Sequence, residues 1–292
     1  MTYIDHINAC NACNIDDFVR FRVGGVNVGW VHRAMAARLS SHLDILNVTV
    51  GGVDIADRFD CFKTRTDAMA ELVDRMLAGG QVPKKRGEQY PVLPVWGAEP
   101  LLSIDRAVVA HFGITAYGVH VNGFVRGPDG IKLWIGRRSA DRTVAPGKLD
   151  NLIAGGQPVG LTLAENLVKE AYEEAAIGPE LAGRAVPAGV VTYMMEVPIM
   201  DALPGSKVAG LKVDCLFNYD LELPANFVPR NVDGEVAGFE LLPWRRVAAI
   251  VRDSNDFKFN CNLVVIDFLI RHGLITPEEP GYLDMCRGLR CW

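Results

Sequence analysis

GGQPVGLTLAENLVKEAYEEAAI, residues 155–177, is the stretch from which the fold can be predicted. Thr162 followed three residues later by Glu165 forms the capping-box pattern that marks the start of a helix. Apolar residues then recur at helical spacing and form one stripe: Leu163, Leu167, Val168, Ala171 and Ala175. The stretch therefore predicts an amphipathic helix that follows a tight Gly-Gly turn.

Three carboxylates lie near the end of the same predicted helix. Glu170 precedes Glu173 and Glu174 by three and four residues, so the three side chains are neighbours on the helix surface. Like charges at this spacing repel one another, and the negative end of the helix dipole disfavours them further. A divalent cation offsets both effects, and Mg²⁺ prefers oxygen ligands. The cluster predicts a Mg²⁺ site, with Mn²⁺ as the alternative ion and the Gly155 carbonyl as a further ligand.

The segment resembles the Nudix box, whose pattern is G-x5-E-x7-R-E-U-x-E-E-x-G-U, where U is aliphatic. Gly155, Glu170, Glu173-Glu174 and Ile177 match the pattern, and Lys169 stands where arginine is usual. Three positions differ: Leu161 stands for the first glutamate, Ala176 for the second glycine, and Ala171 for a larger aliphatic residue. The departures leave the three metal-binding positions intact. We expect Leu161 to pack rather than catalyse, and whether Glu165 replaces the missing acid stays open.

The flanking sequence resembles a Nudix subfamily associated with thiamine pyrophosphokinase. The phrases that carry this resemblance are GRRS at 136–139, NVDGEV at 231–236 and FKFNCNL at 257–263. The similarity covers residues from about Gly113 to Gly273 well and the first third of the chain more loosely. It implies a Nudix-type α/β/α sandwich with a mixed sheet, preceded by a non-Nudix extension.

Composition excludes several classes of protein. The chain has 292 residues, of which 49% are apolar, so it can bury a large core. A net charge of −5 without a long basic run gives no electrostatic footprint for nucleic acid. No apolar stretch approaches the ~18 residues of a membrane helix. Seven cysteines without a secretory signal predict reduced thiols in a cytoplasm.

Two regions are expected. Residues 1–106 predict a smaller α+β domain that packs against the rest or acts as a substrate lid, and residues 107–292 predict the Nudix domain. Residues 79–100 contain glycines, prolines and a Lys84-Lys85-Arg86 triplet, which suit a linker or an extended surface segment with solvated charges. In the second region, strands at 116–125 and 132–138 predict a hairpin around the Gly-Pro-Asp-Gly turn at 127–130.

The hairpin strand supplies the candidates for substrate binding. Successive strand residues point to opposite faces, so one of Arg137 and Arg138 can face the site and bind phosphate. Trp134 of the same strand either stacks on a substrate ring or packs in the core. By the resemblance, Glu235 in a late loop is the general base or an extra metal ligand, with Glu240 as the other candidate.

The predicted function is Mg²⁺-dependent hydrolysis of a small organic diphosphate, with Glu170, Glu173, Glu174 and Glu235 as the catalytic acids. The subfamily resemblance points to thiamine diphosphate or its oxidised derivatives as substrate, cleaved to the monophosphate and phosphate. Two alternatives remain: hydrolysis of nucleoside-diphosphate-linked compounds or damaged nucleotides, and a non-catalytic Nudix module that binds a ligand. The expected partner is a small molecule rather than nucleic acid or membrane, and homodimerisation stays open.

Overall fold

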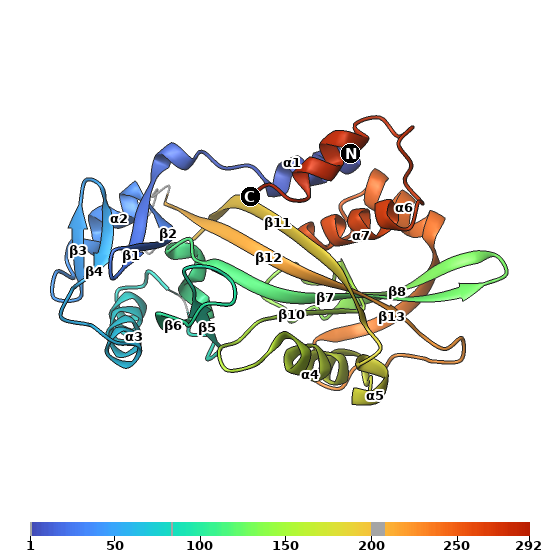
Figure 1. Cartoon of the computed structure of the whole chain (residues 1–292), viewed down its shortest axis with the longest axis horizontal. Helices are drawn as coiled ribbons and strands as arrows, with labels where there is room; N and C mark the ends of the chain where they lie inside the picture. Colours follow the sequence, from blue (N-terminus) through green and yellow to red (C-terminus); the bar gives the residue numbers. More distant parts are fainter. Residues whose placement is uncertain (1, 83, 200–207) are drawn as a thin grey trace.

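A computed structural model describes residues 2–82, 84–199 and 208–292. Within these ranges the largest sheet consists of β7 (Thr115–Gly127), β8 (Gly130–Arg138), β9 (Leu149–Asp150), β10 (Ile153–Gly156), β11 (Val186–Pro198), β12 (Ala209–Glu222) and β13 (Val236–Pro243). The main order is β11-β12-β7-β8-β13, with β10 paired to β7 and β9 to β8 (Figure 1). β12 runs parallel to β7 and the other pairs are antiparallel, so the sheet is mixed.

Helices cover both faces of this sheet. They are α1 (Tyr3–Cys10), α4 (Leu163–Ala175), α5 (Pro179–Ala182), α6 (Trp244–Asp253), α7 (Phe259–Arg271) and α8 (Tyr282–Gly288). α4 and α5 lie on one face, and α7 lies on the other with α1, α6 and α8 around it (Figure 1). The predicted α/β sandwich with a mixed sheet is therefore confirmed, as is the hairpin, which β7 and β8 form through a Gly127–Gly130 turn.

The first region has a sheet of its own. Its strands are β1 (Phe18–Val23), β2 (Val26–His32), β3 (Leu46–Thr49) and β4 (Gly52–Ile55), in the order β2-β1-β4-β3, and its helices are α2 (Arg33–Leu39) and α3 (Phe62–Ala78). The prediction of a linker or an extended surface segment at 79–100 is wrong in part. A two-stranded sheet joins β5 (Gln89–Val92) to β6 (Leu102–Asp105), which leads into the short 3-10 helix η2 (Arg106–His111). Tyr90 and Val92 of β5 are buried in the core of the first region, so this segment is part of a packed domain and not a linker between two domains.

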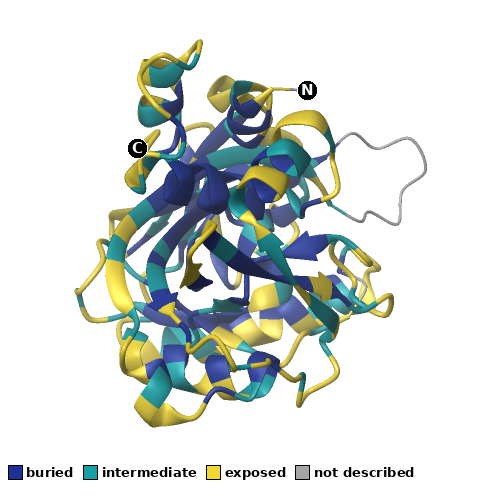
Figure 2. Ribbon diagram, turned by 90° about the vertical axis from the view of Figure 1, so that its right-hand side faces the viewer, coloured by how far each residue is buried: buried dark blue, intermediate teal, exposed yellow. Residues whose placement is uncertain are grey.

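Three main cores hold the molecule together, and Figure 2 shows their buried residues as dark ribbon. One fills the first region, one lies between the sheet and α7, and one lies between the sheet and α4. α1 belongs to the α7 core although it begins the chain. Its Ile7 side chain is fully buried and approaches Gly288 of α8 so closely that a Cβ there would lie 2.4 Å from Ile7 Cγ2. The first helix thus stabilises the far end of the chain.

The packing of α1 can be tested by truncating one side chain. Ile7→Ala should lower the free energy of unfolding by about 2–5 kcal/mol, because it leaves a cavity between α1 and the C-terminal helices. Asn8→Ala changes an exposed residue of the same helix and should alter stability by less than about 0.5 kcal/mol. Chemical denaturation of both purified variants gives the comparison. Equal stability of the two would contradict the packing described.

Candidate active site

The helix α4 forms as the sequence predicts. Thr162 caps it: the Thr162 hydroxyl accepts from Glu165 N at 3.2 Å, and Glu165 Oε2 accepts from Thr162 N at 2.8 Å. Glu165 is therefore engaged in the capping box at the far end of the helix from the acid cluster. At the other end, Ala176 adopts the left-handed backbone with φ 53°, a conformation usually taken by glycine.

Leu161 does not pack as expected. Its side chain is 37% exposed, and the residue contributes through its backbone, because Gln157 Nε2 donates to the Leu161 carbonyl at 2.6 Å. The expectation is wrong because the loop before α4 keeps this side chain on the surface. An exposed aliphatic residue is not a catalytic group either, so nothing at this position supplies the missing acid.

The predicted acids lie together at the edge of β10. Glu174 is buried, and its Oε2 accepts a hydrogen bond from Ala154 N at 2.8 Å. Glu170 has a side chain that is 12% exposed, and Lys169 Nζ binds it at 2.9 Å and binds Glu173 at 2.7 Å. One lysine thus bridges two of the three carboxylates, while Glu174 reaches the strand directly.

Gly155 lets this arrangement form. A Cβ at Gly155 would lie 2.3–2.5 Å from three atoms of the Glu170 side chain, so only glycine allows the carboxylate to approach the β10 backbone. On the neighbouring residue, a Cβ at Gly156 would lie 1.7 Å from the Tyr90 hydroxyl, which comes from the first region. The Gly-Gly pair is therefore a close meeting point of α4, β10 and β5.

The donor set fits a hard divalent cation. Burial raises the pKa of Glu174 to about 8, and the neighbouring Asp150 and Glu170 carboxylates act in the same direction. Burial also raises the pKa of Glu170, against the opposing effect of Lys169. Carboxylates that are hard to ionise together become favourable when a cation offsets their charge. The oxygens of Glu170, Glu173, Glu174 and the Gly155 carbonyl are of the kind that Mg²⁺ binds.

A second group of ligand-type side chains lies deeper in the protein. Among the described residues, His120, Asp150 and Cys261 bring their ligand atoms within 4.8 Å of one another. Arg138 binds Asp150 at 2.5 Å, and the Cys261 thiol donates to the other Asp150 oxygen at 2.6 Å. Burial raises the pKa of Cys261 well above its usual value, so the thiol keeps its proton. Asp150 is thus already paired with the Arg138 cation and with the thiol proton of Cys261. The group forms a hydrogen-bond network and is less suited to bind a metal than the α4 acids are.

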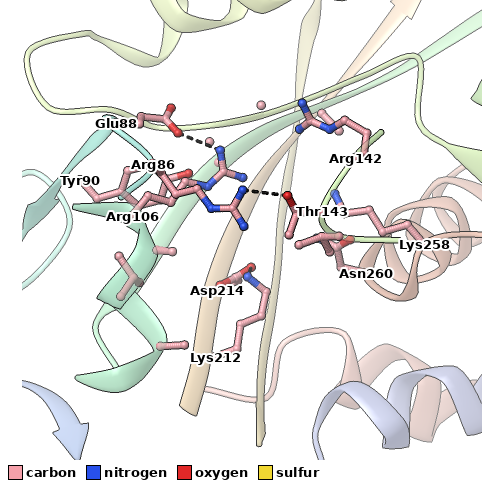
Figure 3. A pocket seen from close by; sticks show the side chains of 18 of the residues that line it. Arg86, Glu88, Tyr90, Arg106, Arg142, Thr143, Lys212, Asp214, Lys258 and Asn260 are labelled. Carbon is pink, nitrogen blue, oxygen red and sulfur yellow. Dashed lines mark hydrogen bonds and ion pairs between the residues drawn. The ribbon is translucent and has the colours of Figure 1, made fainter. Parts of the chain in front are cut away.

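A cavity of about 550 Å³ lies beside this network, between the first region and the sheet. Seven of its lining residues are basic: Lys84, Arg86, Arg106, Arg138, Arg142, Lys212 and Lys258. Four are acidic: Glu88, Asp141, Asp214 and Glu235. Arg86 and Arg106 reach in from one side, and Arg142 and Lys258 lie on the other (Figure 3). The β10 residues Ala154, Gly155 and Gly156 also line it, so the cavity borders the strand edge where the acids lie.

Five of these seven cations pair with an acid, although Arg138 and Lys258 share the single carboxylate of Asp150, so the positive charges still outnumber the negative ones. Arg106 pairs with Glu88 at 2.8 Å and Arg142 pairs with Glu235, whereas Arg86 donates to the neutral hydroxyl of Thr143 at 2.9 Å. Burial and the nearby Arg138 lower the pKa of Arg142, while Glu174 acts in the opposite direction. A cavity with a surplus of positive charge attracts and holds an anion.

The substrate residues predicted on the hairpin lie in three different places. Arg138 lines the cavity, and its side chain is 8% exposed. Arg137 points to the outside, where it donates to the Gly147 carbonyl at 3.1 Å and pairs with Glu240. Trp134 is buried in the core beneath α4, so the structure favours the packing alternative over ring stacking. Glu235 of the late loop lines the cavity.

Sequence reasoning missed most of the cavity lining. Arg86 belongs to the triplet interpreted as solvated charge and Lys258 to the phrase at 257–263, whereas Tyr90, Arg106 and Lys212 stand in no motif. The triplet was a usable signal, because a basic cluster next to buried apolar residues is unusual for a linker. Arg106 and Lys212 gave none, since each comes from a different element and only the fold brings them together.

Comparison with known proteins adds three findings. The family model described as "Domain of unknown function (DUF4743)" matches residues 2–116. Nudix hydrolase 24 and Nudix hydrolase 20 of Arabidopsis thaliana, both named chloroplastic, are 43% and 40% identical to this chain; each alignment covers 99% of the chain and 77% of the relative. The solved structure of a MutT protein from Methanosarcina mazei Go1 matches 54% of the chain and 96% of its own length, with 16% identity and a TM-score of 0.38.

The names of the two relatives contradict the predicted cytoplasmic location, because both are chloroplastic proteins. The prediction rested on seven cysteines and on the lack of a secretory signal. These features argue against an oxidising secretory route, and they do not distinguish a cytoplasm from the interior of an organelle. Among the described residues, none of the helices is long and apolar enough to cross a membrane.

The contact between Gly155 and Glu170 generates a prediction about metal binding. Gly155→Ala places a methyl group where the Glu170 carboxylate lies, and should weaken Mn²⁺ binding about 10- to 100-fold, the usual effect of disturbing a ligand's support. Gly178→Ala is the control, because a Cβ there meets nothing within 4 Å. Electron paramagnetic resonance titration measures both. An unchanged Mn²⁺ affinity in Gly155→Ala would remove Glu170 from the ligand set.

Proposed function

Because the chain belongs to the Nudix hydrolases, we propose that it cleaves the phosphoanhydride bond of a small organic diphosphate, releasing phosphate and the monophosphate. The observation that carries the proposal is the position of the α4 acids at a strand edge that also borders a cation-rich cavity. A hydrolase acting on an anionic diphosphate needs both: a site for a divalent ion and a surplus of positive charge for the phosphates.

We propose Mg²⁺ as the ion, with Mn²⁺ as a substitute, held by Glu170, Glu173, Glu174 and the Gly155 carbonyl. Such an ion supplies charge neutralisation on the phosphate oxygens and lowers the pKa of a nearby water. Within the chain, Lys169 keeps Glu170 and Glu173 side by side, and Ala154 N–H orients Glu174. The acids are thereby positioned before any ligand binds, which reduces the reorganisation that catalysis would otherwise require.

In this proposal Glu235 is the general base or an additional ligand. Its carboxylate is paired with Arg142, and both residues line the cavity. A substrate phosphate that draws the Arg142 guanidinium towards itself would release the Glu235 carboxylate for a proton. Arg142 and Glu235 would then respond together to substrate binding. Arg138 has a supporting role, because its guanidinium is occupied by Asp150 and by the backbone carbonyl of Val144.

The substrate we propose is thiamine diphosphate or one of its oxidised derivatives. Support comes from the subfamily resemblance in residues 136–139, 231–236 and 257–263. The cavity volume of about 550 Å³ also lies within the range of small-molecule sites. Its lining includes aromatic rings, from Tyr90 and Phe259 among others, beside the cations. Rings and diphosphate together match a ligand with flat heterocycles at one end and phosphates at the other.

The first region has a defined part in this proposal. We assign residues 1–106 to an extension that completes the substrate cavity, and 107–292 to the Nudix domain. Arg86, Glu88, Tyr90 and Arg106 lie at the cavity, on or next to the β5–β6 hairpin. An extension with these contacts is part of the binding site rather than a separate lid.

The proposal is tested by a substrate panel at equal Mg²⁺. We expect the highest kcat/KM for thiamine diphosphate or an oxidised form, above 8-oxo-dGTP, ADP-ribose and a nucleotide sugar, and no turnover in EDTA. Tenfold better turnover of a nucleotide, about 1.4 kcal/mol of transition-state preference, would reject the proposed substrate class. Failure to release phosphate from any compound would favour the non-catalytic alternative.

A variant tests the role of the acids separately. Glu174→Gln should reduce kcat by about 10²- to 10⁴-fold, the range for a group acting directly on the reaction, while the protein stays folded. Glu180→Gln, an exposed acid of α5 paired with Arg184, should keep wild-type turnover. Wild-type activity in Glu174→Gln would exclude the site described.

A further inference from the structure

Asp214 of β12 is a buried acid in a cavity built for anions. The residue is 5% exposed and lines the cavity. Lys212, Asp214 and Leu216 alternate along the strand and all three line the cavity, so the Asp214 carboxylate points into it. Figure 3 shows Asp214 and Lys212 across the cavity from Arg142. The two oxygens of Asp214 are used very differently.

One oxygen is held by two donors. Asp214 Oδ2 accepts from the Tyr193 hydroxyl at 2.5 Å and from Lys212 Nζ at 2.8 Å. Burial raises the pKa of Tyr193 well above its usual value, so its hydroxyl keeps the proton that it donates. The orientation of the carboxylate is therefore fixed by its neighbours on β11 and β12.

The other oxygen has no partner. Among the residues that the structure describes, none donates a hydrogen bond to Asp214 Oδ1, although this atom is buried. A buried acceptor without a donor is unfavourable, and such atoms are uncommon in folded proteins. Its negative charge also repels phosphate. Oδ1 is thus unsuited to the anionic end of a substrate and suited to a donor at the other end.

The sheet register places Asp214 away from the acid cluster. Asp214 is paired with Ala116 on β7, and Gly118, two residues further along, is paired with Gly156 on β10. Two strand spacings and a two-residue offset separate Asp214 from Gly156 by about 12 Å. Apolar lining residues accompany this part of the cavity, including Ala116 and Leu216 next to Asp214 in the sheet. An extended diphosphate with its phosphates at β10 reaches this place with its organic end.

We propose that Asp214 is a specificity-determining residue whose Oδ1 accepts a hydrogen bond from an N–H group on the organic end of the substrate. The inference rests on the proposed function and deepens it. The ligand class is a diphosphate carrying an amino-substituted heteroaromatic ring. In a thiamine-type substrate the donor is the amino group of the pyrimidine, which oxidation of the thiazolium ring leaves intact. Lys212 and Tyr193 position the acceptor.

Asp214→Asn tests the role of Oδ1 specifically, because the hydrogen bonds to Oδ2 fix the orientation of the side chain. Tyr193 and Lys212 both donate to the Oδ2 position, so the amide oxygen of the Asp214→Asn side chain should stay there. The NH₂ group of the amide then occupies the Oδ1 position, and an acceptor becomes a donor with almost no change in volume. Simple electrostatics predicts the opposite effect, since removing a negative charge from the cavity strengthens diphosphate binding.

The experiment compares thiamine diphosphate with its 4′-desamino analogue in wild type and Asp214→Asn, with melting temperatures as a folding check. We expect the wild type to prefer the amino compound at least tenfold in kcat/KM, mainly through KM. In Asp214→Asn the preference should fall to within twofold. The inhibition constant of methylenediphosphonate, which carries no ring, should not rise. Asp141→Asn, an exposed cavity acid, should keep the tenfold preference and controls for lost charge.

The outcomes separate the inference from the proposed function. A wild type that turns over both compounds equally, or an Asp214→Asn enzyme that keeps the tenfold preference, overturns the role of Asp214 and leaves the hydrolase assignment standing. A wild type that hydrolyses neither thiamine diphosphate nor an oxidised form overturns the proposed substrate, and the inference falls with it. If Asp214→Asn does not fold, the ratio of kcat/KM for the two compounds in the wild type is the test, and equal values overturn the inference.

Discussion

The hydrogen bond from Ala154 N–H to the Glu174 carboxylate, 2.8 Å long, is the contact on which the site depends. β10 pairs with β7 along one edge, and this bond uses a backbone donor on the other. Asn166 makes a second tie, since its side chain donates to the Gly156 carbonyl at 2.8 Å. Together they fix α4 along the strand, so that Glu170 meets Gly155 without a side chain between them. A helix packed only through its apolar stripe could shift along the strand, and the two hydrogen bonds to β10 prevent this shift.

The cavity also depends on contacts between distant parts of the sequence, because its walls come from the first region, the large sheet and α7. β5 meets β10 where the Tyr90 ring lies against Gly156, and Arg86 meets the β8–β9 loop at Thr143. At the other end of the chain, the N-terminus of α7 supplies Lys258, which is 3.8 Å from Asp150. The buried network of His120, Asp150 and Cys261 lies behind these cations and keeps Arg138 and Lys258 in place. A first region that lost its contact with β10 would open the cavity on one side.

Local features of this protein could be read from the sequence, and contacts between distant residues could not. The α4 capping box, its acids and the β7–β8 hairpin depend on residues within a few positions of one another, which is why spacing predicted them. α1 is a local feature of the same kind, since Tyr3, Ile7 and Cys10 share one helical face. Trp134 shows the limit: strand alternation cannot say which face of a covered sheet holds the ligand. The cations at 86, 106, 212 and 258 become one group only in the folded chain.

The net charge of the chain does not predict the electrostatic potential inside the cavity. The chain as a whole carries −5, yet seven basic and four acidic side chains line the cavity. Charges on the surface are screened by salt beyond about 8 Å, whereas groups that enclose a ligand act on it at short range and with less water between them. An acidic protein can therefore hold an anion, provided that its cations are gathered where solvent is excluded. By the same argument a single buried carboxylate such as Asp214 acts strongly on whatever lies next to it, which is why the proposal assigns its part of the cavity to a hydrogen-bond donor rather than to a phosphate.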